Sequence, residues 1–263
     1  MQTETRSQRI AVTGATGRVG SHLVEILAQR GHDVVPIARS KGVDVVSGEG
    51  LDEALVGAET IIDTATGPSP DQKQATAFFT ASARNLQRAG AAAGAKRIVV
   101  VSIIGIDKFH SGYNAAKLVQ EQTLLQCPLP VRIVRAAQFH EFVEPLVGWT
   151  IQDGVAYVPE MRTQLVAAPV VAETLADAAE EPEIENGRIT EVAGPQAERL
   201  AEVAAAVLTA RGESIEIRES RGGLLAEPDS PDAAAYADGA ALPNPGAELA
   251  GPSFRDWLAT TTA

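Results

Sequence analysis

Short apolar runs alternate with segments of helical periodicity along roughly the first half of the chain. The apolar runs predict buried strands at residues 9–13, 33–38, 43–46, 60–63, 97–102 and 131–135. The periodic segments between them predict helices at residues 21–30, 52–55, 71–93 and 113–126. Continuously apolar strands separated by helices are typical of a parallel sheet covered on both faces. The pattern therefore predicts an α/β fold with a doubly wound parallel sheet, strand order 3-2-1-4-5-6, and a ligand crevice at the carboxyl ends of its strands.

The pattern becomes irregular beyond residue 136, where proline and glycine interrupt it. We expect further strands at 164–168, 188–192 and 214–218, and helices at 171–180, 198–210 and 254–260. The stretch 222–252 is rich in Gly, Pro, Ala and Asp, and predicts a surface loop or a partly helical lobe. We therefore expect a sheet core over residues 1–140, with a smaller lobe over 141–263 interleaved with the last core strands in one structural unit.

Composition excludes several classes of protein. The net charge of −12 argues against non-specific nucleic-acid binding, which requires an excess of Lys and Arg. No apolar stretch approaches the length of a membrane span, and no apolar signal core follows Arg6 and Arg9, so we expect a cytoplasmic protein. The single cysteine, Cys127, has no partner for a disulfide, and the histidines lack the spacing of metal ligands. We therefore expect no metal site.

The first predicted strand ends in the repeat Gly14-x-x-Gly17-x-x-Gly20, and a helical pattern follows from Ser21. Glycines allow a sharp turn and a close approach of the backbone to a phosphate, while the helix N-terminus presents free N–H groups to it. The strand–turn–helix context is the one that a dinucleotide-binding motif requires. The motif predicts such a site; the alternative is a glycine-rich turn that binds nothing.

The end of the second predicted strand indicates which dinucleotide fits. An acidic residue there would bind a ribose 2′-hydroxyl, whereas arginine suits a 2′-phosphate. Arg39 and Ser40 occupy this place, and Arg18 in the glycine turn is a second candidate for the same phosphate. These residues favour NADP(H); the alternative is a pair of solvated surface arginines.

Tyr113 and Lys117 are four residues apart in a predicted helix, so they lie on one face, one turn apart. A tyrosine has a pKa near 10 and is a weak acid–base catalyst at neutral pH. A nearby lysine cation favours the phenolate and lowers that pKa, and the same ammonium can bind ribose hydroxyls. The pair predicts a catalytic acid with its modulator; the alternative is a buried tyrosine beside a lysine whose stem packs on apolar surface.

Together, several features resemble the atypical short-chain dehydrogenase/reductase superfamily, and most closely its NmrA-like NAD(P)H-binding branch: the Thr13–Gly20 turn, Arg39, the strand ending at Ser102, Tyr113-x-x-x-Lys117 and the segment Val192–Pro195. The resemblance implies a Rossmann core over residues 1–140 that binds NADP(H), and a small C-terminal substrate-binding lobe. It further implies hydride transfer, with Tyr113 as the proton donor and Lys117 as its modulator and ribose ligand.

The resemblance also implies the other site residues. The expected cofactor contacts are Gly14, Thr16, Gly17, Arg18, Val19, Arg39, Ser40, Ala65, Thr66 and Lys117. Gln138, Phe139 and His140 are expected to contact the substrate, and His140 is a further catalytic candidate. Ser102 is a candidate too, although relatives with the full catalytic set have Ser-Ser here and this chain has Ile103 at the second position.

Three functions are compatible with these residues. The first is an NADPH-dependent oxidoreductase that reduces a small or medium organic carbonyl or enone. The second is a redox-sensing protein that binds NADP(H) without turnover, which Ile103 favours, and the third is an epimerase or isomerase using the same site. In each case we expect a small molecule as partner, no nucleic acid, no membrane, and a monomer or homodimer.

Overall fold

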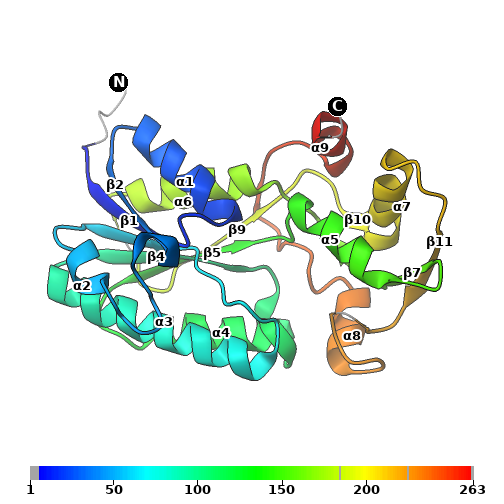
Figure 1. Ribbon diagram of the computed structural model, residues 1–263, viewed down its shortest axis with the longest axis horizontal. Coiled ribbons are helices and arrows are strands. Elements are labelled where there is room, and N and C mark those ends of the chain that lie inside the picture. Colours follow the sequence, from blue (N-terminus) through cyan, green and yellow to red (C-terminus); the bar gives the residue numbers. More distant parts are fainter. Residues whose placement is uncertain (1–5, 184, 224, 262–263) are drawn as a thin grey trace. The chain divides into compact units, whose positions relative to one another are not determined.

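The structure, a computed structural model, describes residues 6–183, 185–223 and 225–261 (Figure 1). The chain divides into two compact units. Unit 1 comprises residues 1–102, 116–134 and 171–190. Unit 2 comprises residues 103–115, 135–170 and 191–263.

The largest sheet in the described part of the chain has seven strands, in the order β12-β9-β5-β4-β3-β1-β2. Their bounds are β1 Arg9–Thr13, β2 Asp33–Ile37, β3 Thr60–Asp63, β4 Arg97–Ile103, β5 Val131–Ala136, β9 Ile189–Ala193 and β12 Glu248–Leu249. Strand β1 pairs in parallel with β2 and β3, β3 pairs in parallel with β4, and β9 pairs in parallel with β12. The predicted doubly wound parallel sheet is confirmed, and its order agrees with the prediction from β2 to β5.

Helices cover both faces of the sheet in unit 1. Figure 1 shows α1 (Arg18–Gln29) and α6 (Ala168–Glu180) on one face, and α3 (Gln72–Ala93) and α4 (Gly112–Leu125) on the other. A short helix, α2 (Leu51–Ala54), packs beside α3. On the α3 side, fully buried Ile61, Ile98 and Ile133 of neighbouring strands pack with Leu86 and Leu124 of the helices. Burial on both faces is the reason these strands are continuously apolar.

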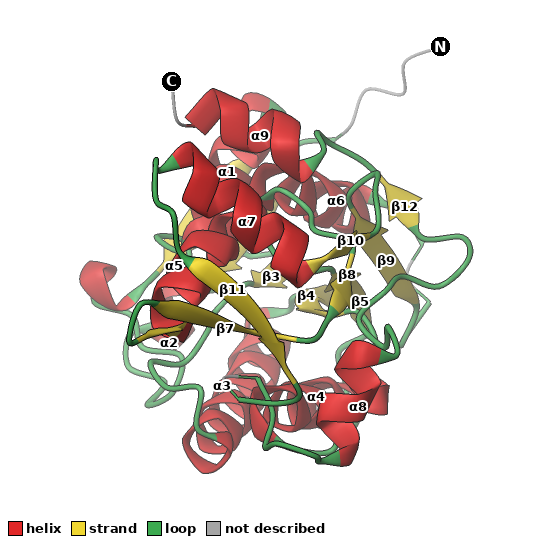
Figure 2. Ribbon diagram, turned by 90° about the vertical axis from the view of Figure 1, so that its right-hand side faces the viewer, coloured by secondary structure: helices red, strands yellow, loops and turns green. Residues whose placement is uncertain are grey.

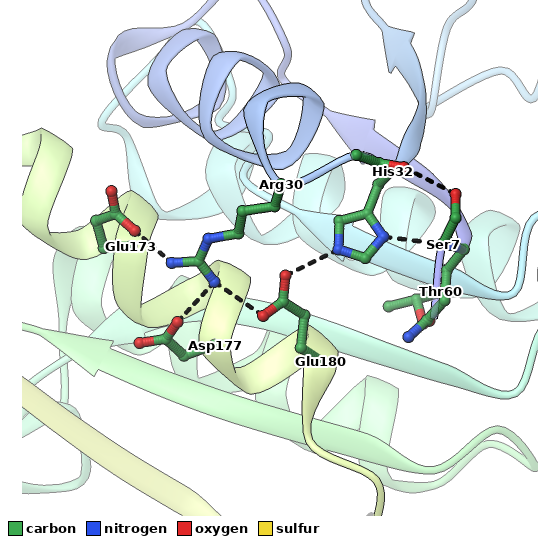
Figure 3. Close-up of polar contacts among 9 residues, drawn as sticks. Ser7, Arg30, His32, Thr60, Glu173, Asp177 and Glu180 are labelled. Atoms are coloured by element: carbon green, nitrogen blue, oxygen red, sulfur yellow. Dashed lines mark hydrogen bonds and ion pairs between the residues drawn. The ribbon is translucent and has the colours of Figure 1, made fainter. Parts of the chain in front are cut away.

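A charged cluster joins α1 to α6 on the other face of unit 1 (Figure 3). Arg30, directly after α1, pairs with Glu173, with Asp177 at 2.7 Å and with Glu180 at 3.0 Å. The buried ring of His32 completes the cluster: its Nε2 lies 2.8 Å from a Glu180 oxygen. These contacts hold the end of α1 against the last turns of α6.

Unit 2 has its own core. Its remaining elements are α5 His140–Thr150, β6 Ile151–Gln152, β7 Val155–Pro159, β8 Arg162–Thr163, β10 Glu198–Arg199, α7 Leu200–Ala210, β11 Glu216–Ser220, α8 Pro231–Ala237 and α9 Phe254–Thr261. Strands β11, β7 and β6 form a small sheet on which α7 packs (Figure 2). Val158, Val207 and Phe254 lie in its buried apolar cluster. The described helices include none that is long and apolar enough to cross a membrane.

Two local predictions, the strands at 43–46 and 164–168, were wrong, and one helix was not predicted. Residues 43–46 form no strand, because side chains satisfy their backbone: Asp44 accepts the Val46 N–H at 2.7 Å, and Asn85 donates to the Val45 and Val46 carbonyls. The predicted strand at 164–168 is reduced to a single bridge between Val166 and Phe139. The irregular stretch after residue 136 contains α5, which forms despite an internal proline because its apolar face is buried.

Candidate functional site

The glycine repeat forms the turn between β1 and α1. Gly14 has φ +66°, and a Cβ there would lie 2.7 Å from the Thr64 carbonyl oxygen. A Cβ on Gly20 would collide with the Gly14 carbonyl. Helix α1 begins at Arg18, and no described side chain caps its N-terminus. The turn therefore has the close packing and the uncapped N–H groups that suit a bound phosphate.

The end of β2 lies beside this turn. The Ala15 N–H donates to the Ile37 carbonyl at 3.2 Å, which joins the glycine turn to the last residue of β2. A short 3₁₀ turn follows at Arg39–Lys41, and all three of its side chains are exposed. Arg18 is exposed as well. Arg18, Arg39 and Lys41 thus lie on the two segments that this bond joins, and Lys41 is a cationic residue that the sequence reasoning did not include.

A buried carboxylate, which the sequence reasoning missed, links the carboxyl ends of β1 and β3. Asp63 is completely buried and accepts three hydrogen bonds: from the Thr13 hydroxyl at 2.5 Å, the Gln120 amide at 2.8 Å and the Ala65 N–H at 3.1 Å. These bonds hold the start of the glycine turn, the segment containing Ala65 and helix α4 together. The sequence feature that could have indicated this contact is a polar residue, Thr13 or Asp63, at the end of an otherwise apolar strand.

Lys117, on α4, is a buried titratable group with a strongly shifted pKa. It is only 5% exposed, although it lies on α4 among charged neighbours. Burial lowers the pKa of Lys117 to about 8, while the charges of Asp63 and Glu121 act in the opposite direction. A strongly shifted pKa on a buried group makes Lys117 a candidate functional residue.

Tyr113 occupies the first turn of α4 and is half-buried. The helix runs unbroken from Gly112 through Lys117, so the predicted spacing of the two residues is that of one helical turn. Ser102 lies at the end of β4 and is 3% exposed. Its hydroxyl has no hydrogen-bond partner in the described part of the chain.

The three residues predicted to contact substrate have different surroundings in unit 2. The Gln138 side chain accepts a hydrogen bond from the Thr163 hydroxyl at 2.7 Å, and Phe139 is half-buried. His140 begins α5 and is completely buried. Its ring lies 5.4 Å from the ring of Phe254 and 5.3 Å from that of Trp257.

The imidazole of His140 is desolvated. Neither ring nitrogen has a hydrogen-bond partner among the described residues. Burial lowers the pKa of His140 to about 4, and the Leu165 backbone acts in the opposite direction. His140 is therefore neutral at physiological pH and packs as an aromatic side chain of the unit 2 core. The described residues also contain no group of acidic, histidine or cysteine side chains arranged to hold a metal ion.

Comparisons with known proteins show the family of this chain. A family model described as NAD(P)H-binding matches residues 14–182. L-arabinose 1-dehydrogenase (NAD(P)(+)) of Haloferax volcanii is 34% identical over 125 residues, which cover 44% of this chain and 48% of that protein. The 4-hydroxy-tetrahydrodipicolinate reductase of Natronomonas pharaonis is 29% identical over 160 residues, which cover 59% and 54%. The chain spans about half the length of the curated relatives it matches.

Solved structures resemble the whole chain. The Bordetella bronchiseptica enzyme WbmG in complex with NAD has a TM-score of 0.70 at 16% identity, with 98% of this chain and 94% of that chain covered. An NADPH-dependent quinone oxidoreductase, QOR2, from Escherichia coli has a TM-score of 0.67 at 18% identity, with 97% and 100% covered. At these identities the likeness concerns the fold.

Proposed function

This chain belongs to the NAD(P)H-binding family, and we propose that it is an NADPH-dependent oxidoreductase that reduces a small or medium organic carbonyl compound or enone. The observation that carries the proposal is Lys117, a desolvated lysine one helical turn after Tyr113. Such a pair serves proton transfer, and a dinucleotide-binding protein without turnover does not require it. The dehydrogenase and reductase activities named for the relatives also support an oxidoreductase.

Unit 1 carries the residues proposed to hold the dinucleotide. Gly14 and Gly20 leave no room for a side chain, and the uncapped N-terminus of α1 faces the proposed phosphate position. The other proposed contacts are Thr16, Arg18, Val19, Ala65, Thr66 and Lys117. When bound, the cofactor supplies the hydride.

The preference for NADPH rests on the turn after β2. Arg39, Ser40 and Lys41 are exposed there and no acidic residue accompanies them. A carboxylate, which would bind a ribose 2′-hydroxyl and repel a 2′-phosphate, is therefore missing from this turn. Two cations and a hydroxyl suit the phosphate instead.

The proton is proposed to come from Tyr113. As the carbonyl carbon accepts hydride, the Tyr113 hydroxyl transfers its proton to the carbonyl oxygen and leaves a phenolate. The Lys117 ammonium favours that phenolate by its charge. Ser102 contributes less in this proposal because its hydroxyl is closed off from solvent. Gln138 and Phe139 remain proposed substrate contacts, whereas the complete burial of His140 supports a packing role.

A redox-sensing protein that binds NADP(H) without turnover is the second candidate. The closed-off hydroxyl of Ser102 and the apolar Ile103 beside it favour this function, because a substrate carbonyl would lack one hydrogen-bond donor. The two candidates differ in one measurable property, which is consumption of the cofactor in the presence of substrate.

The test is NADPH oxidation over a panel containing an aliphatic aldehyde, an aromatic aldehyde, a cyclic enone and a quinone, with NADP⁺ reduction by L-arabinose as the reverse reaction. NADP⁺ affinity is measured in parallel by titration calorimetry. We expect turnover of at least one compound, and a Tyr113→Phe variant about 10²–10⁴-fold slower with unchanged NADP⁺ affinity. Tyr157→Phe, which alters an exposed tyrosine of β7, is the matched control. Tight NADP⁺ binding with no turnover, or a Tyr113→Phe variant as fast as the parent, would contradict the proposal.

A further inference from the structure

Helix α8 binds the stretch of chain that leads into α4, and both lie in unit 2. Asp232, in the first turn of α8, is 4% exposed and accepts three hydrogen bonds from this stretch. One oxygen accepts the His110 N–H at 2.9 Å. The other accepts the Ser111 N–H at 2.8 Å and the Ser111 hydroxyl at 2.5 Å. A buried carboxylate satisfied by two backbone donors fixes the path of the main chain, because releasing either donor would leave charge unsolvated.

Tyr236 binds the same stretch on the other side of Tyr113. Its hydroxyl accepts a hydrogen bond from the Asn114 side-chain amide at 2.6 Å. Its ring stacks on Phe109, with 4.3 Å between the ring centroids and 34° between the planes. Both Asn114 and Tyr236 are buried, so this bond is closed off from water. Asp232 therefore holds the two residues before Gly112, and Tyr236 holds the residue after Tyr113.

A third contact extends the same interface toward β4. Gly105 has φ +71°, and any Cβ there would collide with the backbone carbonyl of Ala240, just after α8. Helix α8 is itself well defined: Ser230 caps its N-terminus by accepting the Ala233 N–H at 3.2 Å, and Pro231 occupies its first turn. Contacts at Gly105, at residues 109–111 and at Asn114 thus attach this stretch to α8 and to the residues just after it.

We propose that Asp232 and Tyr236 are positioning residues that fix the Tyr113 side chain at the start of α4. The inference rests on the proposed function, in which Tyr113 donates a proton. A proton donor must lie within hydrogen-bond reach of the substrate oxygen, so the position of the Tyr113 side chain matters. Gly112, with φ +63° between the two held positions, is the residue about which the start of the helix would otherwise move. Helix α8 therefore belongs to the catalytic architecture although its side chains touch no reacting atom.

The first experiment needs no substrate. The chain has three tyrosines, so protein labelled with ¹³C at the tyrosine Cζ gives three resonances, which Tyr113→Phe, Tyr157→Phe and Tyr236→Phe assign. In Asp232→Asn and in Tyr236→Phe, we expect the Tyr113 resonance to shift or broaden and its pH titration to move. In Asp232→Asn we also expect amide hydrogen exchange at His110 and Ser111 to become about tenfold faster or more, because the amide keeps one acceptor oxygen in place of two.

Asp238→Asn is the matched control, since Asp238 is exposed at the other end of the same helix. Unchanged exchange at residues 110–111 and an unchanged Tyr113 resonance in folded Asp232→Asn and Tyr236→Phe would overturn the inference. If Asp232→Asn does not fold, the Tyr113 resonance in Tyr236→Phe is the deciding measurement. This variant removes only one oxygen atom, so it disturbs the fold less.

The second experiment uses a compound from the carbonyl panel that is turned over with NADPH. We expect kcat to fall about tenfold in Asp232→Asn with NADP⁺ affinity unchanged, and no further fall when this change is added to Tyr113→Phe. Equal additional losses in the two backgrounds would overturn the inference and leave the proposed function standing. If no compound is turned over, the proposed function fails, while the tyrosine resonances and hydrogen exchange still decide whether α8 fixes Tyr113.

Discussion

The ammonium nitrogen of Lys117 lies 4.6 Å from the centroid of the Phe79 ring. Both residues belong to unit 1, and Phe79 is completely buried on α3. The face of an aromatic ring attracts a cation, most strongly where water is excluded. This contact, together with the charges of Asp63 and Glu121, offsets part of the cost of burying the ammonium. Desolvation is still the larger effect, so a charged Lys117 is unfavourable for folding, which supports the role proposed for it.

Replacing Lys117 by methionine tests its proposed role in binding and turnover and, separately, its cost to stability. We expect NADP⁺ affinity and turnover to fall, because the same ammonium is proposed to bind the cofactor ribose and to stabilise the Tyr113 phenolate. The folded-state pKa of about 8 lies below the ordinary value of 10.5, so between these values the unfolded chain binds more protons. The unfolding free energy of the parent, relative to Lys117→Met, should therefore rise by up to about 3 kcal/mol as pH increases from 8 to 10.5. Urea unfolding across this range measures it; parallel curves for the two proteins would show that Lys117 is not desolvated.

Replacing Arg39 by alanine tests the cofactor preference. We expect the dissociation constant for NADPH to rise by about one to two orders of magnitude, since a charge-assisted phosphate contact is worth roughly 1.5–3 kcal/mol. The constant for NADH should change little, because NADH lacks the 2′-phosphate. Titration of cofactor fluorescence measures both, with the exposed Arg218→Ala as control. Equal affinity of the parent for the two cofactors would remove the basis of the preference.

Gly14→Ala and Gly31→Ala form a matched pair for the glycine turn. Both positions have positive φ, +66° and +85°, so both variants carry backbone strain of roughly 1 kcal/mol. At Gly31 an added methyl group would point into open space, whereas at Gly14 the methyl carbon would lie 2.7 Å from the Thr64 oxygen. We therefore expect Gly14→Ala to weaken NADP⁺ binding at least tenfold and Gly31→Ala to leave it unchanged. Equal binding by the two variants would contradict the proposed phosphate position.

The burial of His140 predicts a pH dependence of stability. Its folded-state pKa of about 4 lies below the ordinary 6.5, so the unfolded chain binds more protons between these values. The contribution of neutral His140 to the free energy of unfolding is fully present above pH 6.5. It is lost as pH falls toward 4, by up to about 3 kcal/mol. His140→Phe retains an aromatic ring beside Phe254 and should lose this part of the acid sensitivity. Thermal unfolding of both proteins at pH 7 and pH 5 measures the difference, and identical pH dependence would contradict it.

Local pattern was sufficient for most elements of the sheet and its helices. Apolar runs identified β1 to β5, and the four-residue spacing of Tyr113 and Lys117 correctly predicted that they share one helix. The glycine repeat predicted the strand–turn–helix that the structure contains, and the family match confirms the resemblance to the NmrA-like dehydrogenase/reductase branch. These features depend on neighbours within a few residues in sequence, which is why they can be read without a structure.

Tertiary structure alone decided how the site residues are solvated and held. Asp63 became the partner of Thr13 and Gln120, residues 50 and 57 positions away, and Asp232 reached across 121 residues to Ser111. His140, expected to face substrate, is enclosed by Phe254 and Trp257 of a helix more than 100 residues later in the chain. Periodicity records which side of an element is apolar, but not which distant segment covers it. The pKa of Lys117, the burial of His140 and the anchoring of Tyr113 all depend on that covering segment, because desolvation and buried hydrogen bonds are properties of the folded chain.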